Sequence, residues 1–426
     1  KGYALVRLLQ IVHQFPPVKT GGTELYTQML AQSLAHRGHQ TTVLSRANRT
    51  AVRLERQEIE GVQILTLGAR HTSTVPRFAA SYWEPAAGAV VKQVLAEVRP
   101  DLVHVQHLMG FPLSAITAIR RAGVPFIVTL HDYWWLCPNS QLLQYFDQQL
   151  CSEPDNWRNC ALCAFARLRV PGLSAVAPTL SVFFAQRARM AREALAQAAC
   201  VIAPSQYVLN RYLASGVELP NARVLEHGVD MPERIERVPG AHRPIRVAAI
   251  GGVSWQKGLH VLLEAFEGLE DRAELWLGGN EDFAPDYTRR LYSLAGPSVR
   301  FLGPLSREQV WSVLGQVDLV AVPSLWPETF SLIAHEAFAA GLPIVASDCG
   351  ALAEMVQHGV NGLLVPRGDV AGWHEALLSL VEHPERLQEM GRCVSKPMSL
   401  DEHVDRMLQI YSAFAPSCSD AAKNQG

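Results

Sequence analysis

Residues 320–355 read VAVPSLWPETFSLIAHEAFAAGLPIVASDCGALAEM, and this stretch decides the fold class. The short apolar run at 319–322 is typical of a buried parallel strand. The prolines within 323–327 interrupt that strand and force a turn. Apolar residues at helical spacing predict a helix over 330–340, which a glycine and a proline end. Because residues 344–346 read as the next strand, the stretch alternates strand and helix as an open α/β sheet does.

Two glutamates lie in this unit, Glu328 in the loop and Glu336 within the helix. A helix that follows a parallel strand begins at the carboxyl edge of the sheet, where open α/β folds bind their ligands. The unpaired N–H groups of that helix favour an anion, and Glu328 stands where a sugar or ribose hydroxyl could meet it. The alternative is that both glutamates are solvated helix charges.

Length, charge and hydropathy limit the classes of protein to which this chain can belong. A chain of 426 residues is too long for one ordinary core, which predicts two domains of roughly 200 residues each. The formal net charge of -2 gives no general electrostatic case for nucleic-acid binding. No run of about 18 apolar residues predicts a membrane span, and the N-terminus lacks a signal pattern, so we expect a cytoplasmic protein.

The first half opens as a βαβ unit. Residues 7–13 and 40–44 read as strands, and the helix between them starts at Gly21-Gly22. A glycine pair at this position lets a phosphate or sugar approach the backbone closely. The pair could equally be a tight turn, because the full G-x-G-x-x-G fingerprint is absent.

A second ligand-facing position follows the strand predicted at 125–130. That strand runs into His131 and then into an acidic and aromatic run, DYWW. Aromatic faces suit sugar rings, and His131 can donate to a hydroxyl. The alternative is a core histidine packed among aromatic side chains.

Four cysteines follow with the spacing C-x13-C-x8-C-x2-C, namely Cys137, Cys151, Cys160 and Cys163. Disulfides are rare in a cytoplasmic protein, so the thiols either stay unpaired or hold a structural zinc or an iron–sulfur cluster. The first two gaps match no standard zinc spacing.

A long helix is predicted over 173–199, with Arg187, Arg189 and Arg192 along it. We interpret it as packing on the first core with its arginines in water. The alternative is a peripheral contact with a membrane surface or an acidic acceptor.

The second half starts after a linker predicted at 232–244. A strand at 245–250 leads into the glycine-rich loop GGVSWQKG and a helix at 259–266. Lys257 stands just before that helix, where a cation is unfavourable unless an anion such as a diphosphate binds between them. A strand at 274–277 ends at Gly278-Gly279, residues 306–309 form a capping box, and residues 400–414 form a last helix.

These features together resemble the family-4 retaining glycosyltransferases, also described as glycosyl transferases group 1. The most specific part is PETFSLIAHEAFAAGLPIVAS at 327–347, which matches the family's E-x7-E motif with Glu328 and Glu336. QKGLHVLLEAF matches the segment with the family's phosphate-binding lysine, and EHGVD matches the stretch that closes the first domain. GGTE and LHDYWWLCP match two acceptor-side loops, so the resemblance covers nearly the whole chain.

The resemblance implies the GT-B fold, with two Rossmann-like domains facing each other across a cleft. Residues 1–235 would bind the acceptor and carry the cysteine-containing insertion at about 137–165. Residues 240–400 would bind the nucleotide sugar, and the helix at 401–416 would cross back to the first domain.

The resemblance also implies roles for single residues. Lys257 would neutralise the donor diphosphate, Glu328 would face the hydroxyls of the donor sugar, and His131 would touch that sugar near the reacting carbon. Gly21 and Gly22 would line the diphosphate and the acceptor. No metal would be needed, because the leaving group is stabilised electrostatically.

The remaining donor-binding positions share the carboxyl edge of the second sheet. Glu336 would bind the ribose, and backbone amides would hold the phosphates. The positions are Gly252, Gly279, Thr329, Phe330, Ser331 and Glu336.

The implied activity is retaining transfer of a sugar from a UDP- or GDP-linked donor to a sugar or lipid-linked acceptor in glycan biosynthesis. One departure matters, because the family usually has an arginine five residues before its lysine and Gly252 stands there. Another arginine, or Lys257 with backbone amides, would have to replace it. The alternatives are a non-catalytic or weakly active sugar-nucleotide-binding subunit, or a nucleotide-sugar epimerase on the same fold.

Overall fold

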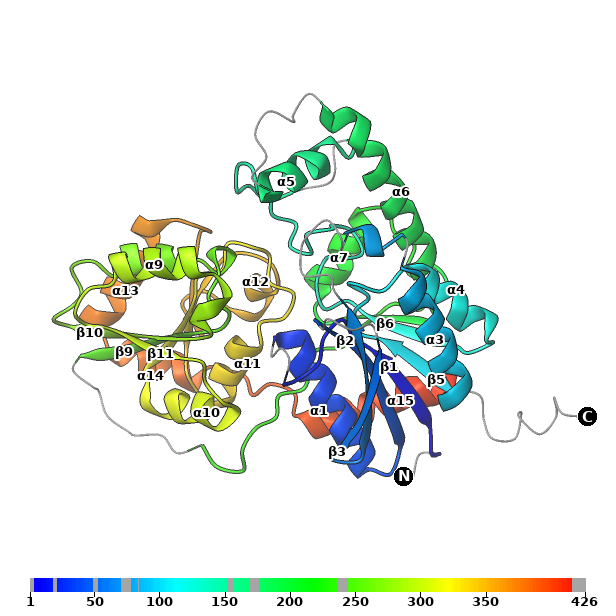
Figure 1. Ribbon diagram of the computed structural model, residues 1–426. Coiled ribbons are helices and arrows are strands. Elements are labelled where there is room, and N and C mark those ends of the chain that lie inside the picture. The colour runs from blue at the N-terminus through cyan, green and yellow to red at the C-terminus, as the bar shows by residue number, and fades with distance from the viewer. Residues whose placement is uncertain are drawn as a thin grey trace, which may run out of the picture. The chain divides into compact units, whose positions relative to one another are not determined.

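The computed structural model describes residues 4–17, 21–48, 53–69, 78–82, 84–151, 156–168, 176–235 and 244–415. The chain divides into two units, one made of Lys1–His227 with Leu400–Gly426 and the other of Gly228–Ser399. Each unit is a β-sheet with helices packed on it (Figure 1). Part of the linker predicted at 232–244 lies outside the described residues.

The sheet of the first unit has eight strands in the order β3-β4-β2-β1-β5-β6-β7-β8. Neighbouring strands pair in parallel except β3 and β4, which form an antiparallel hairpin at one edge. The strands are β1 (Arg7–Ile11), β2 (Gln40–Asn48), β3 (Leu54–Ile59), β4 (Val62–Ala69), β5 (Leu102–Val105), β6 (Phe126–Thr129), β7 (Cys200–Ala203) and β8 (Arg223–Val224). The helices described in this unit include α1 (Gly22–His36), α3 (Pro85–Val98), α4 (Ser114–Arg121), α5 (Arg158–Leu168), α6 (Ala177–Leu195), α7 (Gln206–Ala214) and α15 (Leu400–Phe414).

The sheet of the second unit has six strands, all parallel, in the order β11-β10-β9-β12-β13-β14. The strands are β9 (Ile245–Ile250), β10 (Ala273–Gly278), β11 (Val299–Gly303), β12 (Leu319–Val322), β13 (Ile344–Ser347) and β14 (Gly362–Val365). The helices are α8 (Leu259–Ala265), α9 (Pro285–Leu294), α10 (Arg307–Gln316), α11 (Leu332–Ala339), α12 (Ala351–Met355), α13 (Val370–Glu382) and α14 (Glu385–Arg392), with short 3-10 turns η2 (Trp255–Lys257) and η3 (Glu281–Phe283).

The predicted α/β class and the central strands are confirmed. The strands at 245–250 and 319–322 and the last helix have the predicted bounds. β7 and β12 are apolar runs that are buried throughout, as strands covered on both faces of a parallel sheet must be. The capping box at Ser306 and Gln309 is also present.

The hairpin of β3 and β4 was not predicted. β3 reads LERQEI and most of its residues are exposed, so it lacks the apolar run of a central strand. Charged side chains are typical of an edge strand, because they discourage pairing with another chain.

The long helix α6 corrects one expectation. Arg189 is exposed, as predicted, but Arg187 is 1% exposed and points into the protein. The interpretation that this helix shows its arginines to water is therefore wrong for Arg187. In the described part of the chain, no helix is long and apolar enough to cross a membrane.

The C-terminal helix α15 packs on the first unit. Its His403 Nε2 lies 2.8 Å from the hydroxyl of Tyr26 in α1, and its Tyr411 hydroxyl lies 2.7 Å from Nδ1 of His104 in β5. Arg37, which caps α1, pairs with Asp401 at 2.9 Å. The two buried contacts, those of His403 and Tyr411, thus hold α15 beside the centre of the first sheet.

Candidate active site

Lys257 and Glu328 meet at the carboxyl edge of the second unit's sheet. Lys257 Nζ donates to Glu328 Oε1 over 2.6 Å. The same oxygen accepts from Ser324 Oγ at 2.5 Å and from Trp326 Nε1 at 3.0 Å. Glu328 is 3% exposed, whereas the Lys257 side chain is 33% exposed. The carboxylate is therefore held inside the protein, and the lysine keeps one side toward solvent.

Two glycines allow this meeting. Gly258 has φ +69, and a Cβ on it would lie 1.9 Å from the carbonyl oxygen of Pro323. Gly350 also has φ +69, and a Cβ there would lie 2.4 Å from the carbonyl oxygen of Glu328. A side chain at either position would push the loops apart, so the glycines keep Lys257 and Glu328 in contact.

Glu336 lies in α11 and is 2% exposed. Its Oε1 lies 2.5 Å from Nη2 of Arg307, the first residue of α10. Burial raises the pKa of Glu336, and the Arg307 guanidinium opposes that rise. Glu336 and Glu328 are both buried, so the alternative of two solvated helix charges is wrong.

The turn before α11 is strained at Ser331. This residue has φ +66, in the left-handed region, so the helix begins at Leu332 rather than at the predicted residue 330. Phe330 is buried, and its ring stacks on His335 at 3.7 Å. Strain of this kind clusters at ligand sites, and here it falls on the predicted phosphate-binding position.

Gly252 and Gly279 differ in the space around them. A Cβ on Gly279 would lie 2.0 Å from the carbonyl oxygen of Gly251, so β10 and the loop after β9 approach too closely for a side chain. A Cβ on Gly252 would meet nothing within 4 Å. An arginine side chain at position 252 would therefore cause no steric clash at its Cβ. Arg367 contacts the loop that carries Glu328, since its Nη1 donates to Leu325 O at 3.3 Å.

In the first unit, the glycine pair precedes a buried carboxylate. Gly21 caps α1, and a Cβ on it would lie 2.5 Å from Oε2 of Glu24, whereas Gly22 is open. Glu24 is 3% exposed and pairs with His13 Nε2 at 3.2 Å. The Glu24 carboxylate in the first turn already interacts with the positive end of the helix dipole. This helix N-terminus therefore suits a hydroxyl group better than a second anion.

His131 lies just beyond the carboxyl end of β6 and is 8% exposed. Its Nε2 lies 2.7 Å from Oε1 of Gln106, and an amide oxygen only accepts, so Nε2 carries the proton. Burial holds the pKa of His131 well below its usual range, and His104 and His107 push it in the same direction. His131 is thus neutral at pH 7, as a core histidine would be, although it stands at a strand end.

The Gln106 amide connects His131 to the last helix. Gln106 Nε2 donates to Gln10 Oε1 at 2.8 Å and lies 3.1 Å from Nδ1 of His104. That nitrogen also contacts the Tyr411 hydroxyl, and Nε2 of His104 lies 2.7 Å from Thr129 Oγ1. All of these hydrogen bonds can form together if His104 accepts at Nδ1 and donates from Nε2.

Two family models match this chain. Residues 20–232 match the model described as Glycosyltransferase Family 4, which is half of the chain, and residues 244–383 match Glycosyl transferases group 1. The chain belongs to glycosyltransferase family 4. It is therefore an enzyme of the glycosyltransferase class, as the E-x7-E motif indicated.

Curated relatives of this glycosyltransferase span nearly the same length. Glycogen synthase of Mycobacterium tuberculosis is 26% identical over 93% of this chain and 91% of its own. D-inositol 3-phosphate glycosyltransferase of Nocardia farcinica is 27% identical over 92% of this chain and 85% of its own. The names of these two relatives imply different acceptors. Sequence identity at this level therefore does not identify the acceptor of this chain.

Solved structures share the fold. Sucrose-phosphate synthase of Thermosynechococcus elongatus has a TM-score of 0.72 at 19% identity, covering 95% of this chain and 98% of its own. Anabaena Alr3699/HepE, in complex with UDP and glucose, has a TM-score of 0.68 at 19% identity, covering 96% of this chain and 100% of its own. The predicted GT-B fold is thereby confirmed.

The four cysteines give no support to a metal centre in this glycosyltransferase. Within the described ranges, no three or more His, Cys, Asp or Glu side chains are grouped so that they could hold a metal ion. Burial raises the pKa of the Cys160 thiol and raises that of Cys163 to about 12, so both thiols are neutral at pH 7. The predicted zinc or iron–sulfur cluster is therefore unsupported.

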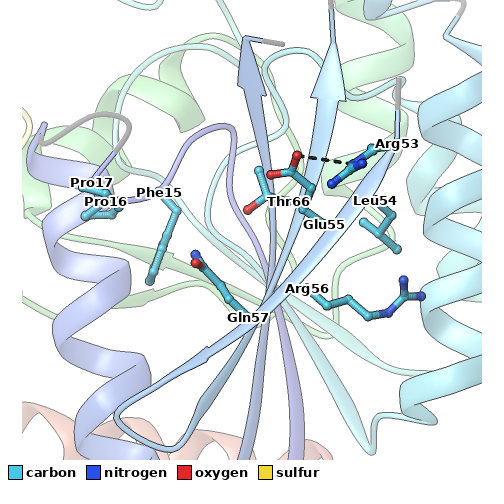
Figure 2. A pocket seen from close by; sticks show the side chains of 9 residues that line it. All are labelled: Phe15, Pro16, Pro17, Arg53, Leu54, Glu55, Arg56, Gln57 and Thr66. Carbon is cyan, nitrogen blue, oxygen red and sulfur yellow. Dashed lines mark ion pairs between the residues drawn. The ribbon is translucent and has the colours of Figure 1, made fainter. Parts of the chain in front are cut away.

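A hollow of about 780 Å³ lies at the edge of the first sheet (Figure 2). One side is formed by the loop after β1 and the other by the hairpin of β3 and β4, where Arg53 and Glu55 pair at 3.4 Å. None of its described lining residues belongs to the predicted site. They are Phe15, Pro16, Pro17, Arg53, Leu54, Glu55, Arg56, Gln57 and Thr66.

Several polar partners in the two sites were missed by the sequence analysis. Ser324 and Trp326 lie within the quoted loop, so their closeness to Glu328 in the chain was the available signal. Glu24 lies within the quoted GGTE motif. Arg307 and Gln106 had no signal, because each meets its partner only through the folded sheet.

Proposed function

We propose that this glycosyltransferase is a retaining enzyme that moves a sugar from a UDP- or GDP-linked donor to a sugar or lipid-linked acceptor. The observation that carries the proposal is the contact of Lys257 with Glu328 at the carboxyl edge of the second sheet. A cation and a carboxylate side by side match the two ends of a sugar diphosphate. The cation suits the phosphates, and the carboxylate suits the sugar hydroxyls.

Glu328 is built to receive a hydroxyl group. Its contacts with Lys257, Ser324 and Trp326 all go to Oε1. The second oxygen, Oε2, therefore serves as the acceptor for a hydroxyl of the donor sugar. The buried Glu336 would bind the ribose, with Arg307 holding its charge, and Gly279, Thr329 and Ser331 would border the phosphates.

The reaction breaks the bond between the anomeric carbon and the diphosphate oxygen. The acceptor hydroxyl forms the new bond on the same face of the sugar, and its proton passes to the leaving phosphate oxygen. Lys257 neutralises the charge that develops on the diphosphate, which is electrostatic catalysis and requires no metal. The neutral His131 would contact the donor sugar by a hydrogen bond and would not pair with its phosphates.

The N-terminal turn of α1 would face the acceptor. Gly22 is open, and Glu24 supplies an acceptor for hydroxyl groups close to Gly21. The comparison with Anabaena Alr3699/HepE, which was solved with UDP-glucose, supports a nucleoside-diphosphate donor.

The test is a donor panel read by nucleotide release. Purified protein is mixed with UDP- and GDP-linked sugars and with a mixture of sugar and lipid-linked acceptors. Release of one nucleotide above the water-only rate is expected, with the anomeric configuration of the product retained by NMR. Inverted product would refute the retaining mechanism while leaving the transferase assignment intact.

Gly252 favours a second candidate, a sugar-nucleotide-binding subunit with little activity of its own. The position lacks the charge that the family places there, although a side chain would fit. Donor binding by calorimetry without nucleotide release from any donor would favour this candidate.

A further inference from the structure

A small cavity in the first unit holds one buried charge. It has a volume of about 280 Å³ and is lined almost entirely by apolar groups. They come from the segment 78–82, from the loop after His131, from α5 and from α6, and include Phe78, Trp134, Leu143, Phe165, Phe183 and Phe184. All four clustered cysteines also line it. Neutral thiols behave as small apolar groups, so they extend this lining.

Two arginines line this cavity, and Arg187 is the buried one, whereas Arg167 is partly exposed and donates to Asn139 Oδ1 at 2.9 Å. Among the described residues, no carboxylate pairs with Arg187. The residue is 1% exposed, and its Nη2 donates to Trp134 O at 2.7 Å. Its guanidinium also lies over the Trp134 ring, 4.5 Å from the centroid. Nε and Nη1 have no hydrogen-bond partner among the residues that the structure describes. Burial lowers the pKa of Arg187 only to about 10, so it is charged at pH 7.

A buried guanidinium with two unpartnered nitrogens is costly, because water cannot solvate it. An anion in the cavity would remove that cost, and arginine prefers groups with several oxygens such as phosphate. The rest of the lining is mostly apolar, with Ser81, Asn139, Asn159 and Arg167 as its other polar members, so it favours a hydrocarbon group. Charge and lining together describe a ligand with a phosphate head and a hydrocarbon chain.

The mouth of the cavity is apolar as well. Phe183 and Leu168 line the cavity and yet are 56% and 40% exposed. Val182, next to Phe183 on α6, is 66% exposed, and Phe146, in the loop that carries the lining residue Leu143, is 43% exposed. Exposed apolar groups gathered at an apolar opening mark a binding surface.

We propose that this cavity binds the phosphate and hydrocarbon chain of a lipid-linked acceptor, with Arg187 contacting the phosphate. Only the identification of this ligand as the acceptor rests on the proposed function. The lipid-phosphate site itself follows from the cavity. The chain connects the two sites directly, since Trp134 and Cys137 line the cavity only a few residues after His131.

The experiment is binding of decyl phosphate to the full chain by calorimetry, below the micelle concentration. Saturable binding is expected for decyl phosphate and not for inorganic phosphate or decanol, which each lack one half of the ligand. Arg187→Met should weaken it by at least about 10-fold, the loss typical of hydrogen bonds to a charged group. Arg189→Met, on an exposed neighbour, should leave it unchanged. Tighter binding of decanoate than of decyl phosphate would overturn the phosphate assignment.

A second variant and a metal measurement test the proposal further. Phe183→Ser changes a half-exposed side chain at the mouth, so it should fold normally and still weaken decyl phosphate binding. Equal binding by wild type, Arg187→Met and Phe183→Ser would overturn the proposal. Stoichiometric zinc or iron in protein purified without chelator would also overturn it, because cysteine thiolates would then neutralise Arg187.

Failure of this site and failure of the proposed function give different results. Nucleotide release with a soluble sugar acceptor, together with no binding of decyl phosphate, rejects the lipid site alone. Binding of decyl phosphate without nucleotide release from any donor rejects the transferase proposal and leaves the lipid-phosphate site standing.

Discussion

Replacing Lys257 by alanine separates catalysis from stability. The change removes the cation 2.6 Å from Glu328 and leaves Ser324 and Trp326 bonded to the same oxygen. Loss of one preorganised charge stabiliser costs about 100- to 1,000-fold in kcat, or about 2.7–4 kcal/mol of transition-state stabilisation. The lysine side chain is 33% exposed, so after solvent screening its ion pair contributes at most about 1 kcal/mol to folding. That corresponds to a Tm shift of about 2–4 °C.

The assay is nucleotide release at saturating donor, with thermal unfolding measured on the same preparations. Lys257→Arg, which keeps the charge, should recover part of kcat. Lys92→Ala removes an exposed lysine on α3 and should match wild type in both measurements. Near-normal kcat in Lys257→Ala would refute the reasoning, and so would a loss of kcat that follows a large fall in Tm.

Three further predictions concern charges inside the two units. Gly252→Arg places the family's arginine in open space and should raise kcat by at least about 10-fold, measured by nucleotide release; an unchanged kcat would mean that Lys257 suffices. Glu336→Gln removes the carboxylate proposed to bind the ribose, so donor KM should rise; because burial disfavours the ionised carboxylate and Arg307 is partly exposed, urea unfolding should show little loss of stability, and an unaltered KM would contradict the ribose role. Burial lowers the pKa of His104 to about 3 and of His403 to about 4, so the folded state resists protonation. Stability should therefore be highest above about pH 6.5 and fall as pH drops toward about 4, and thermal melts of His403→Gln should show a smaller fall.

The sequence predicted the parts of the fold that depend on local pattern. Mainly apolar segments located β9 and β12 to the residue, and the capping box located the start of α10. The start of α11 was misplaced because the left-handed Ser331 has no signature in a sequence of helical spacing. β3 was missed because edge strands avoid the apolar run by which central strands are recognised.

The site was predictable only where its parts lie in motifs. Lys257 and Glu328 are 71 residues apart, and the resemblance rather than any spacing suggested that they meet. The arginines were not predictable at all. Helical spacing gives no difference between the buried Arg187 and the exposed Arg189, because only the packing of α6 decides which side chain turns inward.

The contact between Lys257 and Glu328 has a consequence for donor binding. In the proposed function both residues contact the donor, and in the structure they pair with each other. In the proposed reaction Lys257 turns its charge to the diphosphate, so Glu328 must be stabilised by other donors. Ser324 and Trp326 supply two such hydrogen bonds from within four residues of Glu328. The carboxylate can thus stay in place while the lysine changes partner, and the free energy of separating the pair is small because the lysine is partly solvated. Under the proposed function, this exchange would let a single lysine serve where the family places two cations.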